Sequence, residues 1–482
     1  MRYEPDGSLD STFGTDGLVF TSWGAGRYNY AHAVAILPDG RIVAAGTTGV
    51  GGNVSNPLVS SDFAVARYLG DGSLDSNFGA TEDGRAQISV LRFDDGEAAV
   101  LLPDGRVLVG GFADEEPNTN VDFALAMLSP DGSLDPSFGA GGIATASLSP
   151  SSTDRGYAVA VRPGGEIVIG GTSFVTQVTD PDYAILQYLP SGVIDSEFGD
   201  DGWVLTGRPP DSEQVVAALV PQANGGLLAA GHSYDGVSGT SLGYLAAIAR
   251  YSDDGALDST LADGGWFAHS FAGSYNFFYA ATELPDGRIL AAGRAGPSQG
   301  DFLVARLTAS GVLDPTFDGD GWTITPGPAA EGVRAIAVQP DGKIVVAGYT
   351  LAPGASDIVV ARYMPDGALD ATFGVGGIVV TDAGTPPPVS TEPPPLHEAR
   401  LQVLPSVVNG VASVRYALEM GGPVRLVVHD LLGREVRLVF AGEQPAGRQE
   451  VALETGHLRT GVYLVSLEAE GRSRTTRFVV HR

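Results

Sequence analysis

One nine-residue phrase recurs seven times and fixes what this chain can fold into. It reads DGSLDSTFG from Asp6 and DGALDATFG from Asp366, with five related copies between them. Its central aspartates lie 65, 60, 60, 63, 56 and 56 residues apart at Asp10, Asp75, Asp135, Asp195, Asp258, Asp314 and Asp370. A sustained period of this length indicates one supersecondary unit copied along the chain.

Each unit contains four short apolar stretches in a constant order. The last unit reads VRAIAVQPDG from Val333, KIVVAG from Lys343 and DIVVARY from Asp357, and a fourth stretch such as GWTIT from Gly321 follows each phrase. Short runs rich in Val, Ile, Leu and Ala and bounded by Gly, Pro and Asp are typical of strands. Pro-Asp-Gly between the first two runs favours a hairpin. The sequence therefore predicts four antiparallel strands per unit and no helix.

A single four-stranded sheet buries its faces poorly, whereas sheets arranged radially bury both faces against their neighbours. We therefore predict an all-β fold, a β-propeller of four-stranded blades over residues 1–382. There are six complete sets of the first three strands but seven phrases, so six blades are favoured and seven remain open. We expect the N-terminal stretch Gly17–Ser22 to complete the last blade, which leaves the stretch Gly376–Thr381 surplus.

The units resemble the delta-60 repeats of large bacterial surface and secreted proteins. The matching pattern is aspartate-glycine, leucine-aspartate and phenylalanine-glycine, then a strand ending PDGKIVVAG, and it extends from Asp6 to Gly377. The resemblance implies a propeller. That family shares no catalytic residues, so the resemblance identifies no ligand.

The charge is confined to the repeats. Up to Pro395 there are 17 Lys and Arg against 48 Asp and Glu, and after it 11 against 9, within a total of −29. Phosphate would be repelled by the acidic part, which argues against nucleic acid or an anionic membrane as partner. No run approaches the ~20 apolar residues of a membrane span. With no cysteine, the chain has no disulfide framework.

A second domain follows a proline-rich spacer. TPPPVSTEPPP from Thr385 predicts an extended linker, placed at 383–398, and a domain at 399–482. Its stretches VASVRYAL from Val411, PVRLVVHD from Pro423 and GVYLVSLEA from Gly461 are separated by turn signals. This spacing predicts a small immunoglobulin-like β-sandwich.

This second domain resembles the C-terminal sorting domain of the type IX secretion system in Bacteroidota-like bacteria. The residues that carry the resemblance are Pro405, Asp430, Gly433, Arg434, Gly447, Gly461, Val462 and Tyr463. The resemblance implies that the secretion machinery is a partner, and that the protein is secreted or displayed on the outer cell surface. Such substrates carry a signal peptide, which MRYEPDGSLD does not provide. We therefore expect the natural N-terminus to lie upstream of Met1.

Catalytic and metal signals are sparse. Gly239–Gly243 fits GxSxG around Ser241 but lies in an expected loop, where the nucleophile elbow needs a strand-to-helix turn. None of the seven histidines falls at metal-ligand spacing. Asp314, Asp318 and Asp320 offer oxygen ligands for calcium, but hydrogen bonding within their own turn is the favoured interpretation. The glycine-rich stretch from Gly46 lacks the lysine of a phosphate loop.

Loops on one rim are the expected ligand surface, since binding residues concentrate on variable loops of rigid scaffolds. Two loops leading into first strands are rich in aromatics, and they suggest a glycan- or protein-contact surface. Its residues are Trp23, Tyr28, Tyr30, Tyr275 and Phe277. The sequence thus favours a monomeric, non-catalytic binding or adhesion propeller with no cofactor. The alternatives are a secreted polysaccharide- or peptide-active enzyme that uses acidic residues on the rim or channel, and a structural spacer of a larger surface protein.

Overall fold

The computed structural model describes two compact units, residues 1–386 and 387–482. Within them it describes residues 1–24, 26–50, 60–115, 121–149, 152–174, 182–207, 213–235, 243–297, 300–326, 331–350, 357–382, 402–404, 407–408, 411–418, 421–429, 434–445, 447–456, 458, 460–469 and 472–480. All regular elements in these ranges are strands. The predicted linker 383–398 lies outside them.

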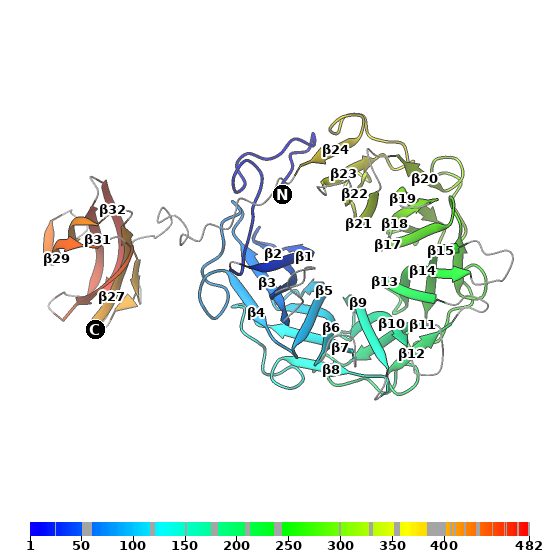
Figure 1. Cartoon of the computed structure of the whole chain (residues 1–482), viewed down its shortest axis with the longest axis horizontal. Coiled ribbons are helices and arrows are strands. Elements are labelled where there is room, and N and C mark those ends of the chain that lie inside the picture. The colour runs from blue at the N-terminus through cyan, green and yellow to red at the C-terminus, as the bar shows by residue number, and fades with distance from the viewer. Residues whose placement is uncertain are drawn as a thin grey trace. The chain divides into compact units, whose positions relative to one another are not determined.

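The first unit is a ring of six four-stranded antiparallel sheets, which confirms the predicted propeller (Figure 1). Blades 1 to 3 contain β1 (Arg27–Ile36), β2 (Ile42–Val50), β3 (Ser60–Tyr68), β4 (Arg85–Ile88), β5 (Phe93–Leu101), β6 (Val107–Asp114), β7 (Asp122–Leu128), β8 (Ile143–Ala146), β9 (Thr153–Val161), β10 (Ile167–Phe174), β11 (Asp182–Tyr188) and β12 (Trp203–Thr206). Blades 4 to 6 contain β13 (Glu213–Pro221), β14 (Leu227–Asp235), β15 (Gly243–Tyr251), β16 (Trp266–His269), β17 (Tyr275–Glu283), β18 (Ile289–Gly296), β19 (Asp301–Leu307), β20 (Trp322–Thr325), β21 (Glu331–Val338), β22 (Ile344–Thr350), β23 (Ile358–Tyr363) and β24 (Ile378–Thr381).

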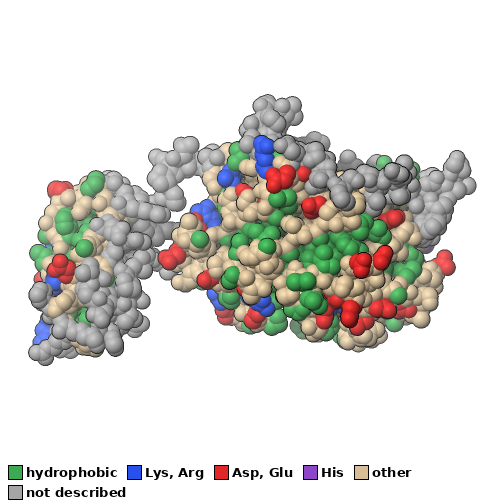
Figure 2. All heavy atoms as spheres, turned by 90° about the horizontal axis from the view of Figure 1, so that it is seen from below, with side chains coloured by type: hydrophobic (Ala, Val, Ile, Leu, Met, Phe, Trp, Pro, Cys, Tyr) green, Lys and Arg blue, Asp and Glu red, His purple; other side chains and the backbone are tan. Residues whose placement is uncertain are grey.

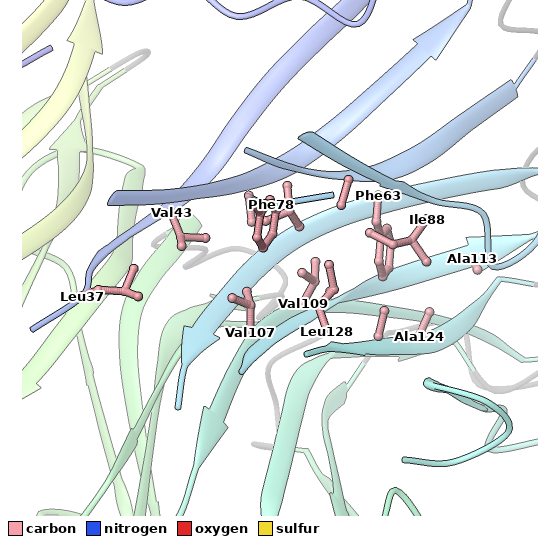
Figure 3. Close-up of a cluster of buried hydrophobic side chains, with 14 residues drawn as sticks. Leu37, Val43, Phe63, Phe78, Ile88, Val107, Val109, Ala113, Ala124 and Leu128 are labelled. Carbon is pink, nitrogen blue, oxygen red and sulfur yellow. The ribbon is translucent and has the colours of Figure 1, made fainter. Parts of the chain in front are cut away.

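Apolar side chains fill the space between successive blades. In the core between blades 1 and 2, Val43 and Phe63 of one sheet face Val107 and Val109 of the next (Figure 3). Phe78, from the recurring phrase, is fully buried in the same core. The phenylalanine of the recurring phrase therefore has a packing role, because its ring fills part of the core between two blades.

The recurring aspartate holds its own turn, as predicted. In the first phrase, Asp10 Oδ1 accepts hydrogen bonds from the Thr12 backbone N at 2.9 Å and from Thr12 Oγ1 at 2.6 Å. In the sixth, Asp314 also pairs with the Arg306 Nε at 2.8 Å. Burial opposes ionisation of Asp314, but hydrogen bonds from Thr316 and Arg288 lower its pKa to about 2.

The phrases form a closed ring of seven, although only six blades have four strands. In each link, the residue at the end of one phrase donates its backbone N–H to the first carbonyl of the next, as Gly14 does to Asp71 at 2.8 Å. The last phrase returns to the first, since Gly374 N donates to Asp6 O at 2.7 Å. The N-terminal segment therefore occupies a seventh position between blade 6 and blade 1.

The expectation that Gly17–Ser22 completes the last blade is wrong. β24 pairs with β23 in blade 6, so Gly376–Thr381 is not surplus. The N-terminal segment instead contacts both neighbours through tyrosine–threonine hydrogen bonds. Tyr3 Oη donates to Thr381 Oγ1 at 2.9 Å, and Thr21 Oγ1 lies 2.6 Å from Tyr68 Oη.

Only the outer part of the seventh position is occupied by described residues. Each innermost strand from β5 to β21 packs on the first two strands of the preceding blade, whereas β1 makes no comparable contact with β21 or β22. On β1, Val34 is 73% exposed and Ile36 is 70% exposed. At the equivalent register of β5, Ala99 and Leu101 pack into an inter-blade core. One apolar face of blade 1 is therefore left open toward the seventh position.

The second unit is the predicted β-sandwich, with two sheets around one core. Val414, Leu426, Leu453, Val465 and Phe478 meet in that core. One sheet has the order β25-β27-β30 and the other β26-β32-β31-β28-β29. The strands are β25 (Gln402–Leu404), β26 (Val407–Val408), β27 (Val411–Leu418), β28 (Gly422–His429), β29 (Glu435–Gln444), β30 (Gly447–Glu454), β31 (Gly461–Ala469) and β32 (Arg472–Val480).

The surface of the first unit carries its acidic charge in a dispersed form. Figure 2 shows Asp and Glu side chains spread over one side of the ring, with few Lys or Arg among them. Among the described residues, no helix has the length and apolar character needed to cross a membrane.

Candidate active site

Every innermost strand carries one extra residue at the same register. A β-bulge interrupts the pairing of β1 with β2 at His32 and that of β5 with β6 at Glu97, and the same shift recurs in all six blades. A bulge leaves one residue unpaired and redirects its side chain. The six bulge residues are His32, Glu97, Tyr157, Ala217, Tyr279 and Arg334.

The bulge residues meet around the axis of the ring. Their strands are innermost (Figure 1). The charge of Arg334, on blade 6, acts on both His32 of blade 1 and Glu97 of blade 2. β21 and β1 flank the seventh position, so this interaction spans the space between blade 6 and blades 1 and 2. We call His32, Asp95, Glu97, Tyr157 and Arg334 the axial cluster.

Two carboxylates lie side by side in the axial cluster. One ligand atom each from His32, Asp95 and Glu97 lie within 4.8 Å of one another. The Nδ1 of His32 is 3.6 Å from Oε2 of Glu97, and these side chains are 34% and 23% exposed. His32 and Glu97 are therefore accessible to solvent and to a ligand at the axis.

Glu97 titrates near neutrality. Burial, and after it the charge of Asp95, raise the pKa of Glu97 to about 7, against the opposing charge of Arg334. Burial also lowers the pKa of His32, helped by Arg334 and opposed by Asp95. Near pH 7, Glu97 thus exchanges a proton beside a second carboxylate. Such a pair, whose environments differ, is the usual arrangement for acid and base roles.

The neighbouring blade positions Asp95. Thr47 Oγ1 of β2 donates a short hydrogen bond to Asp95 Oδ1 and accepts one from Gly96 N at 2.9 Å. A Cβ on Gly96 would lie 2.6 Å from the carbonyl oxygen of Gly46, so glycine is required for this close approach. Thr47 is buried in the middle of β2, so its hydroxyl group is held in position to donate this hydrogen bond.

Aromatic rings and arginines line the opposite side of the axis. The guanidinium carbon of Arg334 lies 4.4 Å from the ring centroid of Tyr279, and that of Arg294 lies 4.5 Å from Phe277. Phe277 and Tyr279 stack at 5.9 Å. Arg334 Nη2 also donates to Tyr349 Oη at 3.2 Å. This side suits a sugar face together with an anion.

The structure places four of the five predicted aromatic residues on strands and not in loops. Tyr28 and Tyr30 lie on β1 with rings 5.4 Å apart, and Tyr275 and Phe277 lie on β17 at 6.4 Å. Trp23 precedes β1, and its indole nitrogen is buried. The two pairs lie on blades 1 and 5 and each adjoins a bulge residue, since Tyr30 is 6.2 Å from His32. A ligand role for these five residues stays a prediction.

The other predicted positions are distributed as follows. Ser241 lies outside the described residues, as do Pro405, Asp430 and Gly433. Gly46–Val50 is part of β2, so the glycine-rich stretch begins in a strand and not in a loop. Gly447 begins β30, Gly461, Val462 and Tyr463 begin β31, and Arg434 precedes β29. Calcium at Asp314, Asp318 and Asp320 stays an untested alternative to the favoured turn role, and Asp320 Oδ1 accepts a hydrogen bond from Trp322 N at 3.2 Å.

Sequence reasoning missed the axial cluster. The signal was present as one variable position in an otherwise apolar first strand, reading AHAVA, GEAAV, GYAVA, VAALV, FYAAT and VRAIA. The spacing of the histidines along the chain does not show that His32 meets acids from the next blade. That trio could hold a divalent cation, but Arg334 places a positive charge within reach of the same atoms. The geometry therefore favours proton transfer.

Comparison with protein families identifies the repeats. The family described as a domain of unknown function (DUF5122) beta-propeller matches residues 37–78, 102–138, 163–198, 284–317 and 339–373. Five segments of this chain therefore match the model of that β-propeller family. The matches run from the first hairpin of a unit to the phenylalanine of its phrase, in five of the six blades. None of the curated proteins matches the chain.

Solved structures similar to this chain include two enzymes and Drosophila Plexin A. A sucrose-6-phosphate hydrolase from Lactobacillus gasseri is 10% identical, with 78% of this chain and 84% of that chain covered and a TM-score of 0.31. An endo-arabinase from Bacteroides thetaiotaomicron is 10% identical, with 60% and 89% covered and a TM-score of 0.26. Drosophila Plexin A in complex with Semaphorin 1b is 11% identical, with 80% and 78% covered and a TM-score of 0.26.

These comparisons correct the expectation that the protein is not an enzyme. Hydrolases stand among the similar solved structures, so a non-catalytic role is not retained. At such low TM-scores, the similarity identifies neither a substrate nor a catalytic residue of this chain. The chemistry proposed below is therefore derived from the axial cluster itself.

Proposed function

We propose that the propeller is a polysaccharide-active hydrolase that cleaves glycosidic bonds at the axial cluster. The supporting observation is the pair Glu97 and Asp95, with Glu97 protonated up to about pH 7. Glycoside hydrolysis requires one carboxylic acid to protonate the leaving oxygen and a second carboxylate to act on the sugar or on water. Glu97 takes the first role and Asp95 the second.

The separation of the two groups bears on stereochemistry. Their ligand atoms lie within 4.8 Å of each other, below the roughly 6.5–9.5 Å at which inverting enzymes hold a water between the two groups, so the retaining mechanism is favoured. Asp95 would then act as the nucleophile: its oxygen bonds to the anomeric carbon while the glycosidic C–O bond breaks and the leaving oxygen takes the Glu97 proton. Water then attacks the anomeric carbon and gives its proton to Glu97, and the bond to Asp95 breaks to release the sugar. Tyr157 offers a ring at the same register for sugar stacking.

The pH dependence of cleavage tests this assignment. We expect the initial rate of new reducing ends from a polysaccharide panel to fall as pH rises through about 7, because Glu97 loses the proton it must donate. The rate is measured on the full chain from about pH 5 to about pH 9. A rate that climbs above pH 7, or a panel without cleavage at any pH, contradicts the proposal.

We further propose that the C-terminal sandwich is an export signal read by type IX secretion machinery, and that the propeller acts outside the cell. The support is the sorting-domain motif, whose Gly461, Val462 and Tyr463 begin a central strand of the larger sheet. The near-neutral charge of this unit sets it apart from the acidic propeller.

A truncation tests the export role. With a cleavable signal peptide added, the full chain should reach the medium or cell surface of a bacterium that has this system. A chain ending at residue 398 should stay in the periplasm, since it lacks the recognised domain. Protease resistance of the retained propeller is the folding control. Equal export of both chains, or unchanged export from a strain without the secretion channel, contradicts the proposal.

A further inference from the structure

Arginines in the outer part of the propeller have carboxylate partners. Arg67 pairs with Asp75, Arg306 with Asp314 and Arg362 with Asp370, each at 2.8 Å. These pairs are structural, because each arginine also donates to a backbone carbonyl of the next unit, as Arg362 does to Pro5 O at 2.6 Å. In a chain with twice as many acids as bases, a paired arginine is the expected state.

Two arginines at the axis differ from this pattern. Within the described ranges, no carboxylate forms an ion pair with Arg294 or Arg334. The Nε of Arg294 is buried and has no hydrogen-bond partner there. A buried donor of this kind is usually satisfied by a ligand or an ordered water. An acidic protein that keeps two unpaired guanidinium groups in one place has local chemistry suited to an anion.

The two guanidinium groups are held in position by one shared ring. Arg334 lies 4.4 Å and Arg294 lies 5.8 Å from the centroid of Tyr279. Arg334 is further fixed over Tyr349 at 5.5 Å, and Arg294 over Phe277 at 4.5 Å. Guanidinium planes stacked on aromatic rings leave their N–H edges free to bind a carboxylate with two hydrogen bonds.

This cationic side lies within electrostatic reach of the proposed acid. The charge of Arg334 acts on Glu97 and on His32. An anion bound at Arg334 therefore faces the same axial space as the group that donates the proton. Aromatic rings, an anion site and a carboxylate pair then lie together at one axis, which is what a sugar bearing its own carboxylate requires.

We propose that the polysaccharide substrate carries uronic acid residues, and that Arg334, assisted by Arg294, binds the sugar carboxylate. This rests on the proposed glycan-cleaving function and names its substrate class. Neutral glycans lack the charge to satisfy both guanidinium groups. The net charge of −29 works against polyanions at long range, so affinity should depend on this local pair.

Binding to matched polymers tests the inference without requiring turnover. Full-length chain carrying Glu97→Gln is titrated calorimetrically with several uronate oligosaccharides and with the same oligosaccharides as methyl esters. We expect at least one free acid to bind about 10- to 100-fold more tightly than its ester, because the ester removes a charge-assisted pair of hydrogen bonds. Arg334→Gln in the same chain should remove that difference.

An arginine elsewhere provides the matched control. Arg425→Gln alters net charge equally but lies in the C-terminal unit, where its partners are Glu435 and Glu468. It should leave both affinities unchanged. If Arg334→Gln misfolds, Arg294→Gln gives the second measurement, with a smaller loss expected.

The outcomes separate this inference from the proposed function. Tight binding of free acids without cleavage by the unaltered chain overturns hydrolysis and leaves the anion site standing. Cleavage of neutral glycans, with acids and esters bound equally, overturns the uronate inference and leaves hydrolysis standing. Acid preference that survives both arginine substitutions also overturns it.

Discussion

Replacing Glu97 by glutamine lowers the rate of polysaccharide cleavage by about 10²- to 10⁴-fold, the contribution usual for a positioned general acid. Glutamine keeps the volume and hydrogen-bonding reach of the side chain but cannot release a proton to the leaving oxygen. The expected loss is in kcat, because the sugar-binding rings and Arg334 are untouched. Initial rates of reducing-end formation over a range of substrate concentrations measure it.

Folding should not confound this result. A carboxyl whose pKa is about 7 in the folded protein and about 4.3 when unfolded destabilises the fold increasingly as pH rises between these values. Glutamine removes that penalty, so the variant should unfold at the same or a higher temperature at pH 8. Glu4→Gln, at an exposed position in the N-terminal segment, is the matched control and should keep full activity.

A second substitution distinguishes the catalytic role of Asp95 from that of Glu97. Asp95→Asn should cost at least as much activity as Glu97→Gln and should also lower the pKa of Glu97, since the Asp95 charge helps to raise it. The falling limb of the pH profile would move to lower pH in any residual activity. Wild-type rates from either variant would show that the chemistry lies elsewhere.

Removing residues 1–22 lowers the unfolding temperature by on the order of 10 °C. The deletion breaks the ring of phrases on both sides, at Gly374 N to Asp6 O and at Gly14 N to Asp71 O. It also removes the acceptor for Arg362 at Pro5 and the hydrogen bonds of Tyr3 and Thr21. About 1 kcal/mol for each bond and about 2 °C for each kcal/mol in a large domain give this estimate.

Filling the seventh position should have the opposite effect. A copy of residues 331–360 joined ahead of Met1 supplies three strands in the correct register, because Met1-Arg2-Tyr3 corresponds to Ala361-Arg362-Tyr363. Burial of Val34 and Ile36 stabilises by about 1.5–3 kcal/mol each before entropy is counted, so a rise of a few degrees is expected.

Calorimetry and hydrogen exchange check both changes. The amides of β1 should become more protected when the added strands are present. An added copy with its apolar strand residues changed to serine is the control, and it should leave both measurements at their starting values. An added segment that stays protease-sensitive and leaves the unfolding temperature unchanged would contradict this account of the seventh position.

Part of the architecture was predictable because each repeat contains the turn-forming residues that separate its strands. The spacing of Asp10, Asp75 and their equivalents, the PDG hairpins and the glycines specify strand number, turn type and radial assembly through local rules. The C-terminal sandwich followed in the same way from alternating strands between turn signals. Each of these features depends on residues within one unit.

The closure of the ring and the site depended on residues from different units. The sequence could not place Gly17–Ser22, because its fourth-strand pattern fits several positions equally well, and only the contacts of Tyr3 and Thr21 distinguish them. In the same way, the sequence predicts these aromatic residues in loops because it marks strand ends poorly, whereas Tyr28 and Tyr275 lie on first strands.

By itself, the sequence determined an acidic, cysteine-free, all-β chain of repeated sheets with a second β-domain. Hydrophobic periodicity and turn residues specify these features, and both depend on residues that are close together in the sequence. Only the tertiary structure decided that His32, Asp95, Glu97 and Arg334 share one axis. The physical reason is the bulge. One unpaired residue per first strand is redirected toward the axis, and closing the ring brings together side chains that lie up to 302 residues apart.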